Sequence, residues 1–147
     1  MVGTKYGKYI ITDPTRIQSG AEVNHSKKEG EYSRFLGFLN KDLMAEAPLY
    51  CNVVRISDPP TQPTLYKSVH VHEVEEVLLF LSIGPDCELG GEVVIHLGSE
   101  GEKHAFSRNT LVYIPKLMKH CPVYFNNFKK DNQFFIISFY FSLNVTN

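Results

Sequence analysis

The stretch VHVHEVEEV, residues 69–77, decides how the rest of this sequence is interpreted. If this stretch is extended, His70 and His72 are two residues apart on one strand, so both imidazoles project from the same face. Glu76 then heads the apolar run VLLFL at residues 77–81. A carboxylate at the start of such a strand is costly to bury unless it is paired or bound to a cation. The pattern therefore favours a metal site.

A fourth candidate ligand lies further along the chain, in PKLMKHC at residues 115–121. The residues around it predict a strand, a proline-marked turn, and a second strand that begins at His120. Three imidazoles and one carboxylate suit Fe(II), Mn(II), Ni(II), Zn(II) or Cu(II) better than Ca(II) or Mg(II), which prefer oxygen ligands. The alternative is that these histidines lie on an exposed strand edge and that Glu76 pairs with a lysine.

The remaining sequence is typical of an all-β protein, because short segments rich in Val, Ile, Tyr and Phe alternate with Gly, Pro, Asn and Asp. Only residues 40–47 have a helical pattern, and Pro48 ends it. This spacing predicts a sandwich or a closed barrel. The predicted strands are residues 8–12, 32–39, 49–57, 65–72, 76–82, 92–97, 110–114, 123–125 and 134–142.

Length and charge exclude several classes of protein. A chain of 147 residues is one domain by size. Its 15 Lys and Arg against 16 Asp and Glu argue against nucleic acid or an anionic membrane as the partner. Three cysteines are too few for a secreted disulfide scaffold. With no signal peptide visible and no apolar run near the ~18 residues of a membrane span, we expect a cytoplasmic protein.

The two histidine segments together resemble the two motifs of the cupin superfamily. The matching pattern is His70-x-His72-x3-Glu76, then Gly84, then Pro115-x4-His120, and it covers about residues 66–124. The resemblance implies His70, His72, Glu76 and His120 as ligands of one divalent transition metal, with Fe expected and Mn, Ni, Zn or Cu as alternatives. The sequence departs from the motifs at Leu117 and Tyr124, where a glycine and an asparagine are usual, and these departures concern turn geometry and substrate class.

The resemblance also implies the architecture. We expect an all-β, double-stranded β-helix with additional N-terminal strands and little helix, in a single domain over residues 1–147. The core barrel would occupy about residues 49–143. Residues 1–48 would pack on the barrel or be exchanged with a partner subunit, as in a homodimer.

Alternation along the strands extends the prediction to a pocket around the metal. Phe80, Leu78 and Ser68 are predicted to bind substrate, with Arg55 as an anchor for a carboxylate. The alternatives are ordinary core packing for the apolar residues and a surface position for Arg55. Tyr124 and Tyr66 are predicted to donate a hydrogen bond to the reacting oxygen. His96 shares a face with Glu92 and is predicted to be solvated rather than a ligand. The odd positions from 135 to 143 form an apolar face that fits either the barrel core or a subunit interface.

These features together predict a metal-dependent enzyme with a small-molecule substrate. We expect a mononuclear non-haem Fe(II) oxidoreductase of the dioxygenase type, acting on a small aromatic or carbonyl compound. The first alternative is a lyase, decarboxylase or isomerase that uses Mn, Zn or Ni as a Lewis acid. The second is a cupin that binds a small molecule without turnover.

Overall fold

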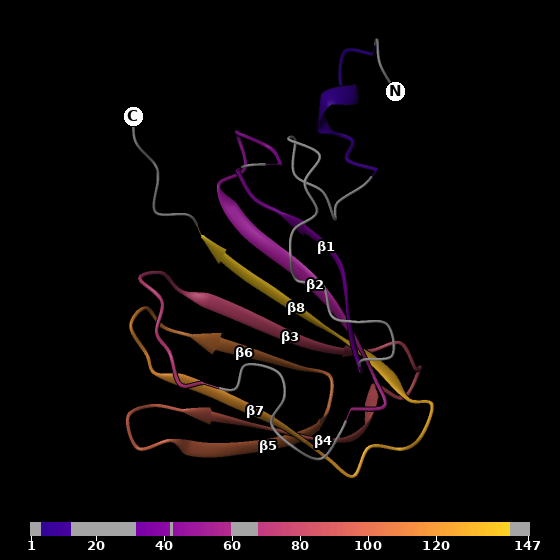
Figure 1. The fold of residues 1–147 in the computed structure, drawn as a ribbon, viewed down its shortest axis with the longest axis vertical. Helices are drawn as coiled ribbons and strands as arrows, with labels where there is room; N and C mark the ends of the chain where they lie inside the picture. The colour runs from indigo at the N-terminus through magenta and orange to yellow at the C-terminus, as the bar shows by residue number, and fades with distance from the viewer. Residues whose placement is uncertain (1–3, 13–31, 42, 60–67, 142–147) are drawn as a thin grey trace.

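The computed structural model describes residues 4–12, 32–41, 43–59 and 68–141 of the chain (Figure 1). Within these ranges eight strands form two sheets, and a short 3-10 helix, η1, covers Gly7–Tyr9. The strands are β1 (Ser33–Leu39), β2 (Leu49–Ser57), β3 (Glu76–Ser82), β4 (Glu88–Leu97), β5 (Glu102–Arg108), β6 (Thr110–Ile114), β7 (His120–Asn126) and β8 (Gln133–Phe141).

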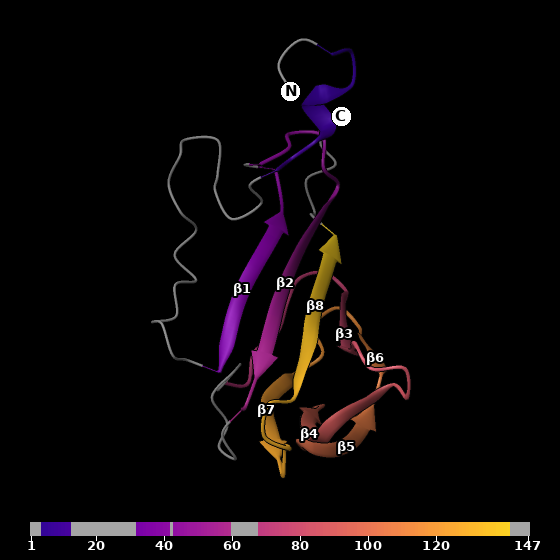
Figure 2. The same ribbon diagram turned by 90° about the vertical axis from the view of Figure 1, so that its right-hand side faces the viewer.

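The larger sheet has the strand order β1-β2-β8-β3-β6, and the smaller sheet has the order β5-β4-β7. Every neighbouring pair is antiparallel. The β1–β2 side of the larger sheet projects away from the smaller sheet, as Figure 2 shows. The all-β prediction is therefore confirmed, and β1 pairs with β2 of its own chain.

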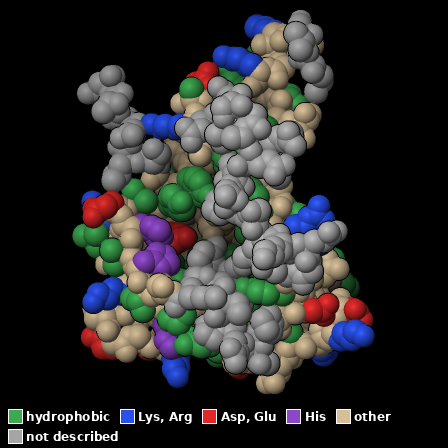
Figure 3. Space-filling model, in the orientation of Figure 1, with side chains coloured by type: hydrophobic (Ala, Val, Ile, Leu, Met, Phe, Trp, Pro, Cys, Tyr) green, Lys and Arg blue, Asp and Glu red, His purple; other side chains and the backbone are tan. Residues whose placement is uncertain are grey.

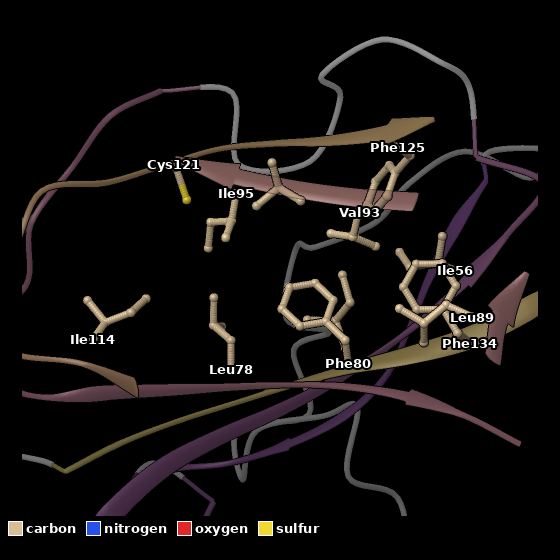
Figure 4. Packing of buried hydrophobic residues seen from close by; sticks show 12 residues of the cluster. Ile56, Leu78, Phe80, Leu89, Val93, Ile95, Ile114, Cys121, Phe125 and Phe134 are labelled. Atoms are coloured by element: carbon tan, nitrogen blue, oxygen red, sulfur yellow. The ribbon is translucent and has the colours of Figure 1, made fainter. Parts of the chain in front are cut away.

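The core lies where the two sheets face each other. Leu78 and Phe80 project from β3 toward Val93 and Ile95 of β4 (Figure 4). Phe80, Val93 and Ile95 have no exposed surface, and Leu78 is 2% exposed. Because successive side chains of a strand point to opposite faces, burying alternate residues of both sheets fills the space between them.

Three expectations about local structure were wrong or incomplete. Residues 8–12 do not form a strand, because Gly7–Tyr9 is a 3-10 helix. Residues 40–47 predict a helix, but the described residues there form only turns, with the Leu43 N–H donating to Asn40 Oδ1 at 3.0 Å. The strand β5 was not predicted, since EKHAFSR is exposed over most of its length and lacks the alternation that marks a half-buried strand.

The expected strand over residues 65–72 is also revised. Residues 65–67 lie outside the described residues, and the described part contributes only an isolated bridge between His70 and His120. No helix in the described ranges is long and apolar enough to cross a membrane.

The structure shows on which side of the larger sheet the odd, apolar positions of β8 lie. The residues of β8 that are buried in the core are Phe134, Ile136 and Ser138, at even positions. The odd positions from 135 to 141 therefore lie on the outer face of the larger sheet. The barrel-core interpretation of the odd positions is wrong, which leaves the subunit interface as the explanation to test.

Candidate metal centre

Backbone pairing brings the two histidine segments together. The N–H of His70 donates to the carbonyl of His120, and the N–H of His120 donates to the carbonyl of His70, each at 3.1 Å. The Leu117 N–H donates to the carbonyl of His72 at 2.9 Å. The segment before β3 is thus fixed against the connection between β6 and β7 and the start of β7.

This pairing gathers three imidazoles, which we call the histidine cluster: His70, His72 and His120. Their ligating atoms lie within 4.8 Å of one another. At the start of β3, Glu76 Oε2 is 3.1 Å from His120 Nε2 and 3.4 Å from His72 Nε2. Figure 3 shows histidine side chains at the surface beside an acidic side chain and among hydrophobic ones. The predicted convergence of His120 with the other candidates is confirmed.

Two buried atoms in this group have no hydrogen-bond partner. Glu76 Oε2 and His120 Nε2 face each other across 3.1 Å, but the geometry is not that of a hydrogen bond. The side chain of His120 is 1% exposed and that of Glu76 is 7% exposed, so water does not compensate freely for the missing partners. A cation between them would satisfy both atoms, and the donor set therefore fits a transition metal.

Second hydrogen bonds fix the orientation of two of the rings. Nδ1 of His70 is 2.9 Å from the Ser68 carbonyl, and Nδ1 of His120 is 2.9 Å from the Met118 carbonyl. When Nδ1–H donates to a carbonyl, the lone pair of Nε2 remains available for a metal. His70 and His120 thus have the supporting contacts that are typical of metal-binding imidazoles.

The pKa shifts of the ionisable groups follow from burial and from Glu76. Burial lowers the pKa of His72, and the nearby Glu76 carboxylate opposes that effect. Burial also acts to lower the pKa of His120, but the contact with Glu76 and the bond to the Met118 carbonyl outweigh it and the pKa is raised. Burial and then the Glu76 charge raise the pKa of Cys121 to about 12, which makes this thiol a structural group rather than a nucleophile.

The structure separates two predicted site residues from the cluster. Tyr124 pairs with Val94, whose neighbours Val93 and Ile95 face the core, so Tyr124 lies on the outer face, where its ring is 5.2 Å from that of His96. The prediction that it shares a face with His120 is wrong. Alternation fails because the register between β4 and β7 shifts between His120 and Val123, where Cys121 has φ +72°.

Arg55 is also on the wrong face for its predicted role. It follows Val54 and precedes the fully buried Ile56, so its side chain projects outward from the larger sheet. A carboxylate beside the histidine cluster is therefore not within its reach. Its cross-strand neighbours are Arg34 of β1 and Phe135 of β8.

The remaining pocket predictions have different outcomes. Leu78 and Phe80 do share the face of Glu76, but the opposite sheet covers them completely, so they are core residues and offer no surface to a substrate. Ser68 is exposed and contributes its carbonyl to His70. Tyr66 lies outside the described residues.

Two aromatic residues near the cluster were not predicted. Tyr140 of β8 pairs with Glu76 of β3 and stacks on His72, with ring centroids 5.5 Å apart and an interplanar angle of 14°. Tyr50 of β2 is the partner of Tyr140 on the other side and stacks on it, with ring centroids 4.6 Å apart and an interplanar angle of 15°. A signal existed in the polar character of Ser138 and Tyr140 at even positions of β8, but strand pairing was needed to interpret it.

Comparison with solved structures identifies the fold. No family model and no curated protein matches the chain. Oxalate oxidase in complex with glycolate is 15% identical, with a TM-score of 0.53, over 99% of this chain and 64% of that one. FeII HppE is 16% identical, with a TM-score of 0.50, over 81% of this chain and 55% of that one.

A Cupin 2 conserved barrel domain protein from Salinispora arenicola CNS-205 is also similar, at 16% identity over 76% of this chain and 75% of that one, with a TM-score of 0.45. The chain spans about half to two thirds of the length of the HppE and oxalate oxidase chains. The chain has the cupin fold, and its histidine cluster can hold one divalent metal ion.

Proposed function

We propose that this chain is a metal-dependent cupin enzyme, a mononuclear non-haem Fe(II) oxidoreductase of the dioxygenase type that acts on a small aromatic or carbonyl compound. The observation that carries the proposal is the buried Glu76 carboxylate facing the buried Nε2 of His120 beside two further imidazoles. Four such donors leave two positions of a six-coordinate ion, one for substrate and one for oxygen.

The charge of the donor set supports an anionic ligand. Three neutral imidazoles and one carboxylate leave a divalent ion with a net charge of about +1. Two solved structures with this fold also support the choice of iron and of redox chemistry, since one is named as an Fe(II) protein and the other as an oxidase.

Each part of the chain has a separate task in this proposal. Bound Fe(II) would supply redox and Lewis-acid chemistry at a substrate oxygen. The carbonyls of Ser68 and Met118 hold the Nδ1 protons and so direct the Nε2 atoms of their histidines toward the ion. Behind Glu76, the buried side chains of Leu78 and Ile114 exclude water from the inner side of the site (Figure 4).

The test is oxygen consumption by anaerobically purified protein loaded with Fe(II), measured with a panel of small phenols, 2-oxo acids and 1,3-dicarbonyl compounds. We expect substrate-dependent oxygen uptake that is lost when Zn(II) replaces Fe(II). Turnover retained with Zn(II) in the absence of oxygen would instead support the Lewis-acid enzyme. Melting shifts without any product would support a binding protein, and failure of the wild type to bind any of these metals would overturn the proposal.

A further inference from the structure

The three rings of the histidine cluster are not supported in the same way. His70 and His120 each direct Nδ1 toward a backbone carbonyl at 2.9 Å. In the part of the chain that the structure describes, no backbone carbonyl accepts a hydrogen bond from the ring of His72. The side chain of His72 is also 31% exposed, against 1% for His120, so packing alone does not fix its orientation.

His72 has an aromatic contact instead of that hydrogen bond. The Tyr140 ring lies parallel to the His72 ring, and the Tyr50 ring lies parallel to that of Tyr140 on its neighbouring strand. Strand pairing fixes these positions, because Tyr140 is opposite Glu76 on one side and Tyr50 on the other. Both tyrosines therefore belong to the inner face of the larger sheet, beside the cluster.

We propose that Tyr140, with Tyr50 behind it, is the positioning residue that orients His72 for metal binding, an inference that rests on the proposed metal site. A flat ring stacked on an imidazole restricts its rotation, as a hydrogen bond from Nδ1 does for the other two histidines. The stacking surface performs this task, so the phenol hydroxyl of Tyr140 is not required for it.

The test measures metal affinity rather than activity. The Co(II) affinity of Tyr140→Leu, determined by competition with a chromophoric chelator, should be lower than that of the wild type by about tenfold, the effect typical of losing a group that orients a ligand. Tyr140→Phe keeps the ring and should retain wild-type affinity. The visible absorption of the Co(II) protein, which reports ligand geometry, should change in Tyr140→Leu and stay the same in Tyr140→Phe.

The chain offers a matched control in Tyr124→Leu. Tyr124 also lies against a histidine, but that histidine is His96 on the outer face of the smaller sheet. This variant should bind Co(II) with wild-type affinity. If it weakens binding as much as Tyr140→Leu does, the effect is general destabilisation and the inference is overturned.

Other outcomes separate this inference from the proposed function. If the wild type binds Co(II) and Tyr140→Leu binds it equally well, the positioning role is wrong and the metal site stands. If Tyr140→Phe loses as much affinity as Tyr140→Leu, the hydroxyl rather than the stack is responsible, which also overturns the inference. Should Tyr140→Leu fail to fold, Tyr50→Leu removes the outer ring of the stack and should give a smaller loss; unchanged affinity there would contradict the role.

Discussion

At residue 120 an imidazole is buried against a carboxylate, and neither facing atom has a hydrogen-bond partner. Such a pair is costly in an apolar surrounding unless a third group compensates both atoms. His120 is therefore the side chain at which the metal hypothesis is most easily tested.

Replacing His70 or His120 with alanine should lower the metal bound per chain by at least about tenfold at limiting metal, because each change removes a direct ligand. Metal content can be measured by elemental analysis after gel filtration. His96→Ala is the control, because His96 lies against Tyr124 on the outer face of the smaller sheet. Equal metal content in all three variants would contradict the assignment.

The sequence was sufficient for some residues of the site and insufficient for others. His70 and His72 could be predicted because alternate positions on extended chain share a face, and the segment around His120 added a second pattern. Tyr140 could not be predicted, because its contact with His72 depends on the register between β3 and β8. Tyr124 was placed wrongly because one register shift at Cys121 reverses the alternation that follows it.

Among the elements, the connection between β6 and β7 contains a leucine with a left-handed backbone conformation. Leu117, at the position where the family motif usually has glycine, has φ +63°, a conformation that L-residues adopt at a cost. Its N–H donates to the carbonyl of His72, so the turn contributes to the position of a predicted ligand. The fold keeps the glycine-like backbone although the glycine is absent.

Leu117→Gly should therefore stabilise the protein. Relief of the left-handed conformation, less the entropy that glycine adds to the unfolded chain, should give about 0.5–1 kcal/mol. The Leu117 side chain is 53% exposed, so little buried surface is lost. Urea unfolding followed by circular dichroism gives the free energy of unfolding. A decrease in that free energy would show that the side chain contributes more than its exposure indicates.

At the scale of the elements, three strands were predicted with their observed bounds. Residues 49–57, 76–82 and 110–114 were predicted with the bounds that β2, β3 and β6 have in the structure. The pattern failed for β5, which is exposed over most of its length. It predicted β8 as residues 134–142, within one residue of its bounds at each end, but not which face of β8 enters the core. In β8 the core face could not be chosen from hydrophobicity, since only the pairing with β2 and β3 distinguishes its two sides.

At the scale of the whole molecule, the outer face of the larger sheet carries apolar side chains within the described ranges. Neighbouring strands contribute to it, and Leu111 and Tyr113 of the edge strand β6 are 59% and 56% exposed. Two antiparallel sheets can pack face to face with their strands nearly aligned, and a self-complementary face gives a two-fold dimer. Its central residues are Val77, Leu79, Leu111, Tyr113, Ile137 and Phe139.

We therefore expect a homodimer formed through this face. Light scattering after gel filtration should give about twice the chain mass of 16.8 kDa for the wild type. Leu111→Glu should shift the mass toward that of the monomer, because a carboxylate would be buried without a partner. Ile83→Glu changes an apolar residue in the turn after β3 that is 71% exposed, and this variant should stay dimeric. A monomeric wild type would refute the expectation.

The reciprocal bonds between His70 and His120 have a consequence for how the molecule would respond to chelators. They join two stretches that are remote along the chain, and neither histidine belongs to the buried hydrophobic cluster. An ion bound by these histidines would hold the two stretches together. Its removal would allow them to open locally while the apolar core keeps its packing. Metal-free protein would then appear folded in measurements that average over the whole molecule and would still fail to bind a ligand at this site.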